Sequence, residues 1–308
     1  MNAYDFDILG LGCVAVDDLL YIPAYPAPDS KAPVRRHERQ CGGLTATALV
    51  AAARQGARCA YAGTLGEDDL SRFVLACLHQ EGIDTSLVRC LPGGRPIQSW
   101  VIVDDSRQTR TILYNLEGVE GAREDWPPEE AIRSSRVLFV DHFGVEGMIR
   151  AAKLARHAGR PVVADFESDQ MPQFPELLAL ADHLIIAGAF AWRLTGEDDP
   201  RRAVNRLWSG EREAVVVTCG TEGCWYRGKA TGSQPLFHVA FAVETVDTTG
   251  CGDVFHGAYA AALLENGPLP ARIRFAAAAA ALKATQCGGQ AGIPRRARVE
   301  AFLKEHAE

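Results

Sequence analysis

The 308-residue sequence lacks the hydrophobic segments that would place a protein in a membrane or direct it out of the cell. It contains no run of about 18 apolar residues. Its first residues, MNAYDFDILGLGCV, do not combine a basic segment, an apolar stretch and a cleavage site. The alanine run at 276–281 is too short to cross a bilayer. We therefore expect a cytoplasmic protein with no membrane partner.

Positive charge is also scarce. Lys and Arg number 32 against 39 Asp and Glu, so the formal net charge is −7 at pH 7. Nucleic-acid phosphates require a basic surface, and this charge balance argues against a nucleic-acid partner. The nine cysteines form no CxxC pair and their number is odd, which argues against zinc sites and disulfide frameworks. They are typical of reduced thiols in a cytoplasm.

The composition is that of a globular protein with a sizeable core, because 47% of the residues are hydrophobic and 23% are charged. Short β-branched runs alternate with helical patterns, as in VVADF at 162–166 and EAVVVTCG at 213–220. This alternation predicts an α/β fold with a mainly parallel sheet and helices on both faces, in one domain over 1–308. Ligands of such a sheet bind at the carboxyl ends of its strands.

Two stretches interrupt the alternation. Residues 19–40 hold four prolines and a basic cluster, while 97–114 has the pattern of two strands around the polar turn DDSRQ. We expect these stretches to pair into a small antiparallel β lid, formed from about 17–41 and 95–117, over the edge of the main sheet.

The segment VDTTGCGDVFHGAYAAAL at 246–263 places an aspartate where a glycine-rich turn meets a helical run. Gly267 and Pro268 are stop signals for that helix, so Asp253 lies at or next to its N-terminus. In one interpretation, the carboxylate only caps the helix. In the other, the turn and the helix N-terminus direct N–H groups at an anion, and the aspartate accepts a proton from an attacking hydroxyl in phosphoryl transfer.

DTTGCGD at 247–253 resembles the C-terminal signature of the ribokinase-like (PfkB) carbohydrate kinases, whose usual form is D-T-x-G-A-G-D. Cys251 stands in place of the usual alanine, a small change that keeps the backbone donors. The resemblance implies that Asp253 is the catalytic base and that the N–H groups of Gly250, Cys251, Gly252 and Asp253 form an anion hole. It covers about residues 5–303 and implies a ribokinase-like fold.

The N-terminal half carries the candidate sugar site. GCVAVD at 12–17 is similar to the family's G-x-x-x-x-D, which makes Asp17 a candidate to bind two sugar hydroxyls, with a turn-capping role as the alternative. CGGLTATALVAAARQGA resembles the family's first signature, in which Gly42 and Gly43 let the backbone approach the sugar. Thr47 stands where the family often has Asn and offers one hydroxyl in place of an amide.

Two further substrate candidates follow from their places at strand ends. Asn115 lies at the end of the lid, and His142 comes just after the strand RVLFVD, although a solvent-facing loop is equally compatible with this histidine. The arginines at 35, 36 and 39 are interpreted as solvated lid charge. Because none of the pocket positions is a permanent cation, we predict a neutral sugar, or at most a singly charged acid or sulfonate.

The nucleotide side rests on two segments. VVVTCGTEG at 215–223 resembles the family's strand and glycine turn beside ATP, which suggests Thr218, Gly220 and Gly223 as nucleotide contacts. AAAAAALKATQCGGQAGIP at 276–294 resembles the segment that brackets adenine, with Gly288 and Gly289 in its loop. Its GG and AGIP portions are similar to the branch that includes bacterial sulfofructose kinases.

The resemblance also implies cofactors and an assembly. ATP and Mg²⁺ are expected, and in many relatives backbone oxygens near the residue matching Asp247 hold a monovalent cation, which implies K⁺. Many relatives carry N-x-x-E for the metal and phosphate, but this chain has Ala187 and Phe190 there, and neither can bind a hard cation. We expect nucleotide oxygens, water and carboxylates such as Asp165 or Glu167 to hold Mg²⁺. A homodimer through the lid is implied as well.

These residues predict an ATP-dependent kinase that phosphorylates a hydroxyl group of a small sugar or sugar-like acceptor. A sugar- or nucleotide-binding regulator without turnover and a nucleoside kinase of the same fold are the alternatives. A nicotinamide-dependent oxidoreductase would need G-x-G-x-x-G, and GLGCVA at 10–15 lacks the third glycine.

Overall fold

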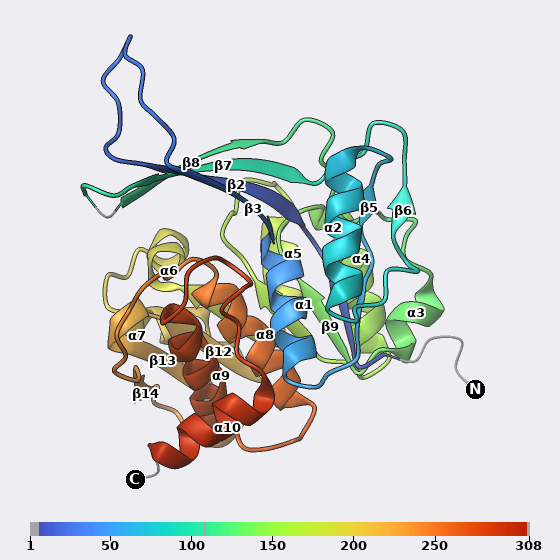
Figure 1. Ribbon diagram of the computed structural model, residues 1–308. Helices are drawn as coiled ribbons and strands as arrows, with labels where there is room; N and C mark the ends of the chain where they lie inside the picture. Colours follow the sequence, from blue (N-terminus) through green and yellow to red (C-terminus); the bar gives the residue numbers. More distant parts are fainter. Residues whose placement is uncertain (1–5, 108, 307–308) are drawn as a thin grey trace.

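The computed structural model describes residues 6–107 and 109–306 of the chain (Figure 1). Its strands are β1 (Ile8–Leu11), β2 (Ala15–Ile22), β3 (Arg36–Gly42), β4 (Cys59–Tyr61), β5 (Thr64–Leu65), β6 (Arg89–Cys90), β7 (Ile97–Asp104), β8 (Thr109–Asn115), β9 (Val137–Val140), β10 (Val162–Asp165), β11 (His183–Ala187), β12 (Ala214–Thr218), β13 (Gly223–Gly228) and β14 (Leu236–Val239). Its α-helices are α1 (Leu44–Arg54), α2 (Asp69–Gln80), α3 (Glu129–Ser134), α4 (Val145–His157), α5 (Phe174–Leu180), α6 (Gly188–Thr195), α7 (Pro200–Leu207), α8 (Cys251–Leu263), α9 (Leu269–Ala284) and α10 (Arg296–Glu305).

An eight-stranded sheet forms the centre, in the order β14-β13-β12-β11-β10-β9-β1-β4. The strands from β12 to β4 are parallel, while β13 and β14 add antiparallel at one edge. Strands such as AVVVT of β12 and VVAD of β10 are rich in β-branched residues and almost wholly buried, because helices cover both faces. The predicted α/β fold with a mainly parallel sheet is confirmed.

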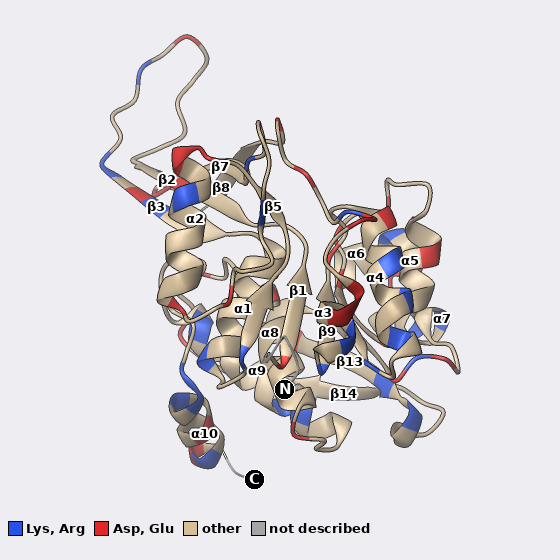
Figure 2. Cartoon of the chain, turned by 90° about the vertical axis from the view of Figure 1, so that its right-hand side faces the viewer, with Lys and Arg blue, Asp and Glu red and all other residues tan. Residues whose placement is uncertain are grey.

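The helices form two layers around this sheet. Figure 2 shows α1, α8 and α9 on one side of it and α3 to α6 on the other. Successive strand residues point to opposite faces. Ile8 and Val216 accordingly join the hydrophobic cluster under α1, α8 and α9, and their neighbours Leu9 and Val217 join the other cluster. In the described part of the chain, no helix is both long and apolar enough to span a membrane.

A second sheet of four strands, β3-β2-β7-β8, lies at one end of the molecule (Figure 1). β2 pairs antiparallel with β3, and β7 with β8, but β2 and β7 run parallel from the Ala15–Ile97 pair to the Ile22–Asp104 pair. The expectation of an entirely antiparallel lid is wrong at this pairing. In this sheet β3 and β8, the second strands of the two hairpins, lie at the outer edges. The first strands, β2 and β7, therefore lie side by side in the middle.

Candidate active site

Candidate functional residues follow the strands of the core sheet. Asp141 comes directly after β9, Asp165 ends β10, Ala187 ends β11 and Thr218 ends β12. These strands are parallel neighbours, so their carboxyl ends lie along one edge of the sheet. Ligands of parallel α/β sheets bind at such an edge.

Helix α8 begins with backbone donors that lack an intrahelical partner. Its N-cap is Gly250, whose φ of 75° is a left-handed conformation that favours glycine. The amide of Cys251 turns back and donates to the carbonyl oxygen of Thr248 at 3.2 Å. The N–H groups of Gly252 and Asp253 are therefore the first-turn donors best suited to an anion, with the positive end of the helix behind them.

Asp253 is not the residue that caps α8. The cap position belongs to Gly250, and no side-chain cap hydrogen bond is formed there. Burial within the site raises the pKa of Asp253 well above its ordinary value, and the negative charges of Asp165 and Glu167, followed by those of Asp17 and Asp141, raise this pKa further. The side chain is therefore a stronger base than an ordinary exposed aspartate.

Asp17 lies beside Gly42, at the junction of β2 and β3. A Cβ atom on Gly42 would lie 2.1 Å from the Oδ2 of Asp17, so only glycine leaves room for this carboxylate. Burial raises the pKa of Asp17, and a hydrogen bond from Ser99 on β7 opposes that rise. Gly43 is equally constrained, because its φ is 93° and a Cβ atom would lie 2.7 Å from the Cα of Val14. The two predicted glycines thus bring backbone and carboxylate together.

The other predicted substrate residues already make contacts within the protein. Thr47 is buried, and its hydroxyl accepts a hydrogen bond from the Nε2 of Gln290 at 3.2 Å. This bond joins α1 to the loop after α9, and the expected contact of Thr47 with the sugar stays a prediction. The Oδ1 of Asn115 accepts from the backbone amide two residues later at 2.9 Å, and the Nδ1 of His142 accepts from the amide of Glu167 at 3.4 Å.

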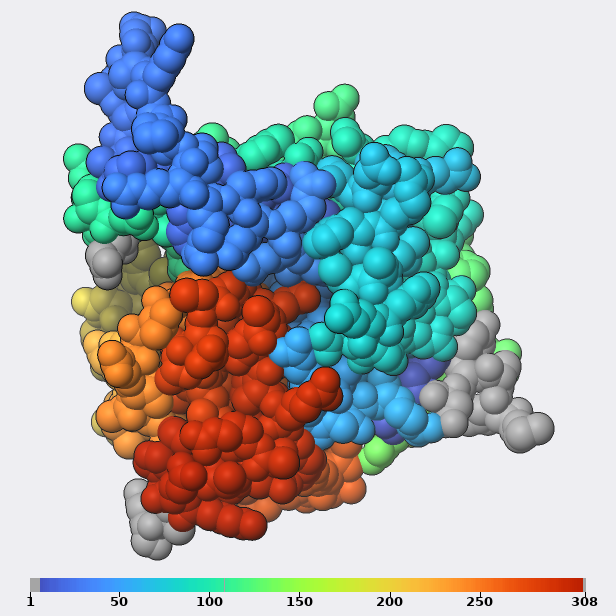
Figure 3. Space-filling view, viewed as in Figure 1, coloured from blue at the N-terminus to red at the C-terminus, as the bar shows by residue number. Residues whose placement is uncertain are grey.

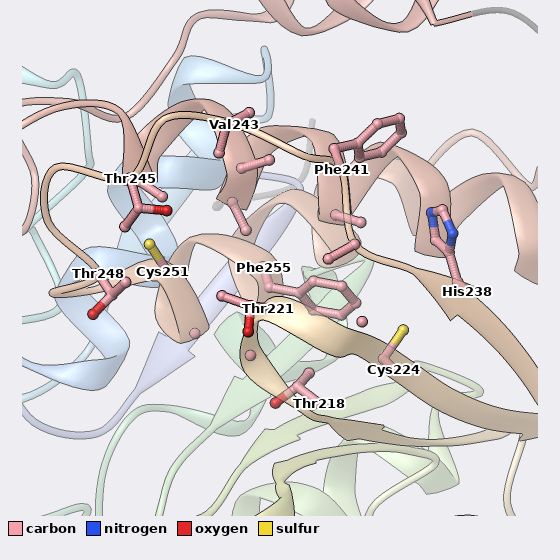
Figure 4. Close-up of a pocket in the computed structure, with 18 of the residues that line it drawn as sticks. Thr218, Thr221, Cys224, His238, Phe241, Val243, Thr245, Thr248, Cys251 and Phe255 are labelled. Atoms are coloured by element: carbon pink, nitrogen blue, oxygen red, sulfur yellow. The ribbon is translucent and has the colours of Figure 1, made fainter.

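A cavity of about 590 Å³ opens beside the start of α8 (Figure 4). In Figure 4, Thr248 and Cys251 lie at one end of it and His238 at the other. Its walls are largely apolar, with Phe241 and Val243 on the segment before α8. The alanines of α9 that line it are Ala277, Ala280, Ala281 and Ala284, and the predicted residues that line it are Thr218, Gly220, Gly223, Cys251 and Gly252. An apolar slot that ends at backbone donors suits a purine base with its phosphates.

Gly288 and Gly289 are not among the residues that line this cavity, and their expected contact with the nucleotide stays a prediction. The amide of Gly288 donates to the Oδ2 of Asp247 at 2.8 Å, and the amide of Gly289 donates to the Oε1 of Gln40 on β3 at 3.0 Å. Figure 3 shows the C-terminal segments directly against the N-terminal ones on this face. The loop after α9 therefore links the DTTGCGD segment to the second sheet.

Comparison with known proteins now gives the family. The model of the pfkB family of carbohydrate kinases matches residues 12–296. The chain belongs to this family. A ribokinase of Haemophilus influenzae is 29% identical over 304 residues, which is 96% of this chain and 98% of that protein. A probable fructokinase of Arabidopsis thaliana is 27% identical over 293 residues, covering 85% and 87% of the two chains.

Solved structures show the same fold. Arabidopsis thaliana ribokinase, complexed with ribose and ATP, has a TM-score of 0.85 at 24% identity and covers 98% of this chain and 99% of its own. Thermotoga maritima ribokinase has a TM-score of 0.84 at 23% identity, and the match covers 97% of this chain and 100% of that one. The protein is an ATP-dependent carbohydrate kinase that phosphorylates a sugar hydroxyl.

Arg110 is a residue of this kinase that sequence reasoning missed. Its guanidinium reaches from β8 to the Oδ1 of Asp247 at 3.2 Å and also contacts the hydroxyl of Thr249. Arg110 and Asp247 lie 137 positions apart along the chain, and no local sequence pattern predicts their contact. A permanent cation of the second sheet therefore touches the loop that precedes α8.

Asp141 was also missed as an organising residue of the kinase. Its fully buried carboxylate accepts hydrogen bonds from the amide of Cys13 at 2.7 Å, the hydroxyl of Thr45 at 2.9 Å and the amide of Phe143 at 2.8 Å. Burial raises the pKa of this carboxyl. An acidic residue directly after a buried strand was the available signal, and Asp141 joins the ends of β1 and β9 to α1.

Of the two positions that depart from the N-x-x-E pattern, Ala187 ends β11 and lines the cavity without offering a metal ligand, whereas Phe190 lies in the core. Phe190 is buried and packs edge-on against Phe174, with ring centroids 6.0 Å apart.

Asp165 is also buried, and its Oδ2 has no hydrogen-bond partner although the Nδ1 of His256 lies 3.4 Å away. Burial raises the pKa of Asp165 to about 6. A buried carboxylate oxygen without a donor fits a hard cation nearby.

Proposed function

We propose that Asp253 is the general base that activates the acceptor hydroxyl, and that Asp17, Gly42 and Gly43 hold the sugar. The observation that carries this proposal is the position of Asp253 at the start of α8. Gly252, just before it, lines the nucleotide cavity, and the carboxylate is close enough to Asp17 for that charge to raise its pKa. A base at this point has the nucleotide on one side and the sugar residues on the other.

In the proposed reaction, the acceptor hydroxyl oxygen attacks the terminal phosphorus of ATP. The new oxygen–phosphorus bond forms as the bond between that phosphorus and the β,γ-bridging oxygen breaks, and ADP leaves. The hydroxyl proton passes to the Oδ of Asp253, late in the transfer. The amides of Gly252 and Asp253 stabilise the negative charge on the transferred group.

Magnesium fits this site through Asp165 and Glu167. Both carboxylates act on the pKa of Asp253, which supports their position beside the reacting groups. A bound magnesium ion would neutralise phosphate charge. Ala187 and Phe190 contribute no ligand, so the remaining ligands would be nucleotide oxygens and water. The resemblance also implies a potassium ion at Asp247.

The proposed acceptor is a neutral sugar, or at most a singly charged acid or sulfonate such as a sulfofructose-like sugar. The lid arginines are already paired, because Arg39 donates two hydrogen bonds to Asp18 at 2.8 and 2.9 Å and Arg35 lies 3.4 Å from Asp105. A dianionic phosphate ester would need unpaired cations at the sugar site.

The test compares ADP release with ribose-like and fructose-like sugars, their monophosphates and their sulfonates. We expect the highest kcat/KM on a neutral sugar or a sulfonate. A preference for a monophosphate would overturn the substrate class. ATP binding without ADP release on any sugar or nucleoside would instead favour a binding protein without turnover. Ala187 and Phe190, which stand in place of the N-x-x-E pair, support that alternative.

We also propose that two chains pair through the second sheet, and that the protein is located in a reducing cytoplasm. The edge strand β8 exposes Ile112, Leu113 and Tyr114, whose relative exposures are 53%, 51% and 66%, and exposed apolar edges favour association. All nine cysteines are free, which supports a reducing compartment. Sedimentation of the wild type and of Ile112→Lys tests the dimer, since only the wild type should sediment as two chains.

A further inference from the structure

A buried lysine lies at the end of helix α9, beside the site. Lys283 has a relative exposure of 0%, and its Nζ donates to the carbonyl oxygen of Asp247 at 2.8 Å and to the carbonyl oxygen of Gln286 at 3.4 Å. Burying an ammonium group is costly unless it is hydrogen-bonded. The side chain therefore has a specific role at this point.

The ammonium joins the two loops that frame the start of α8. Asp247 belongs to the DTTGCGD segment, and Gln286 belongs to the loop after α9. The amide of Asp247 also donates to the carbonyl oxygen of Ala284, the last residue of α9, at 3.1 Å. The amide of Gly288, in the loop after α9, donates to the Oδ2 of Asp247 at 2.8 Å. Lys283 adds the positive charge at the centre of this junction.

The groups around this ammonium act on its pKa in both directions. Burial lowers the pKa of Lys283 most and the charge of Arg110 lowers it further, while Cys251, Asp247 and Cys287 raise it. A lysine near a helix C-terminus often bonds the carbonyls of its own last turn. Lys283 instead reaches Asp247, which lies 36 positions earlier in the chain.

A monovalent metal ion does not fit beside this lysine. The carbonyl oxygen of Asp247, the expected ligand, already accepts a hydrogen bond from the ammonium at 2.8 Å. A second cation on the same oxygen would lie within a few ångströms of the first, with strong repulsion at a buried site. The residues at this junction thus disagree with the potassium site that the family resemblance implies.

We propose that the ammonium of Lys283 takes the place of a monovalent metal ion in this kinase. It is a positioning residue: it fixes the loop from Asp247 to Gly250 and, through it, the amides of Gly252 and Asp253. The chain then needs no potassium for turnover. This inference rests on the proposed role of the α8 N-terminus, but its first test does not depend on turnover.

The first experiment measures the thermal unfolding of the wild type without substrates in potassium, sodium and tetramethylammonium chloride at equal ionic strength. ADP release is then measured in the same salts. We expect the same melting temperature and the same rate in potassium and sodium. A higher melting temperature or a faster rate in potassium would overturn the proposal. If no sugar is phosphorylated, the proposed function fails, and the unfolding comparison still decides this inference.

The second experiment uses Lys283→Met, which removes the charge but keeps much of the volume, with Lys153→Met on the surface of α4 as the matched control. Misplacing the amides of α8 should lower kcat by about 100-fold with little change in the KM for sugar. Potassium or ammonium, but not tetramethylammonium, should restore part of kcat and raise the melting temperature of Lys283→Met. A loss that no monovalent cation repairs would contradict the cation role. If Lys283→Met does not fold, the wild-type salt series decides alone.

Discussion

At the residue scale, the proposed sugar site depends on the absence of a side chain at Gly42. A Cβ atom on Gly42 would lie 2.1 Å from the Oδ2 of Asp17, so Gly42→Ala should displace this carboxylate. Hydrogen bonds to a charged group contribute about 1.5–3 kcal/mol, so kcat/KM for the sugar should fall roughly 10- to 100-fold. ATP affinity should not change.

Gly210→Ala is the matched control for this variant, because a Cβ atom at Gly210 would meet nothing within 4 Å. Steady-state kinetics with varied sugar and with varied ATP separate the two effects. Equal kinetics of Gly42→Ala and the wild type would remove Asp17 from the sugar site.

The carboxylates around Asp253 predict a pH effect. As the proposed base, Asp253 must be ionised for turnover, and its raised pKa places the loss of activity on acidification at a higher pH than an ordinary aspartate would. Asp165 is the largest charged contributor to that rise, so Asp165→Asn should lower the pKa of Asp253 and move the acid limb of kcat/KM to lower pH.

This shift is read from the midpoint of the acid limb, which is independent of the absolute rate. Asp125→Asn, at an exposed carboxylate that pairs with Arg89, should leave the midpoint of the acid limb as in the wild type. An acid limb that stays fixed or moves to higher pH in Asp165→Asn would refute the assignment of this limb to Asp253.

At the element scale, what could be predicted depended on distance along the chain. The start of α8 was predictable because the glycine turn and Asp253 are contiguous, and the Gly42–Gly43 turn was predictable for the same reason. The contacts of Arg110 and Lys283 with Asp247 join residues 137 and 36 positions apart, and no local pattern specifies them. The parallel β2–β7 pair was missed because it is set by how two hairpins meet.

The hairpin of β7 and β8 offers a test of one such contact. Arg110→Ala removes the hydrogen bond to Asp247 and the contact with Thr249, which order the loop before α8. Charged hydrogen bonds of this kind contribute about 1.5–3 kcal/mol, so kcat should fall roughly 10-fold or more. Arg35→Ala, one residue before β3 of the same sheet and 62% exposed in its side chain, should leave kcat unchanged. Equal rates for the two variants would show that Arg110 is only surface charge.

At the scale of the whole molecule, the fold brings two sets of residues to one edge of the core sheet. The cavity proposed for the nucleotide is lined by β12, the segment before α8 and the alanines of α9, while the residues proposed to hold the sugar come from β2, β3 and the turn after β3. The alternating pattern predicted this sheet and the edge at which ligands bind. It could not predict the hydrogen bonds by which Gly288, Gly289 and Thr47 join distant segments, because those contacts depend on side-chain packing.

Helix α8 connects the two sets of residues, and Asp253, the proposed general base, lies at its start. Asp253→Asn keeps the shape of the side chain but cannot accept a proton. ADP release with the preferred sugar should fall by about 10²- to 10⁴-fold, the usual contribution of a positioned base. Calorimetric titration should show ATP binding as in the wild type. Loss of ADP release with intact ATP binding would support Asp253 as the base, and near-normal ADP release by Asp253→Asn would contradict that role.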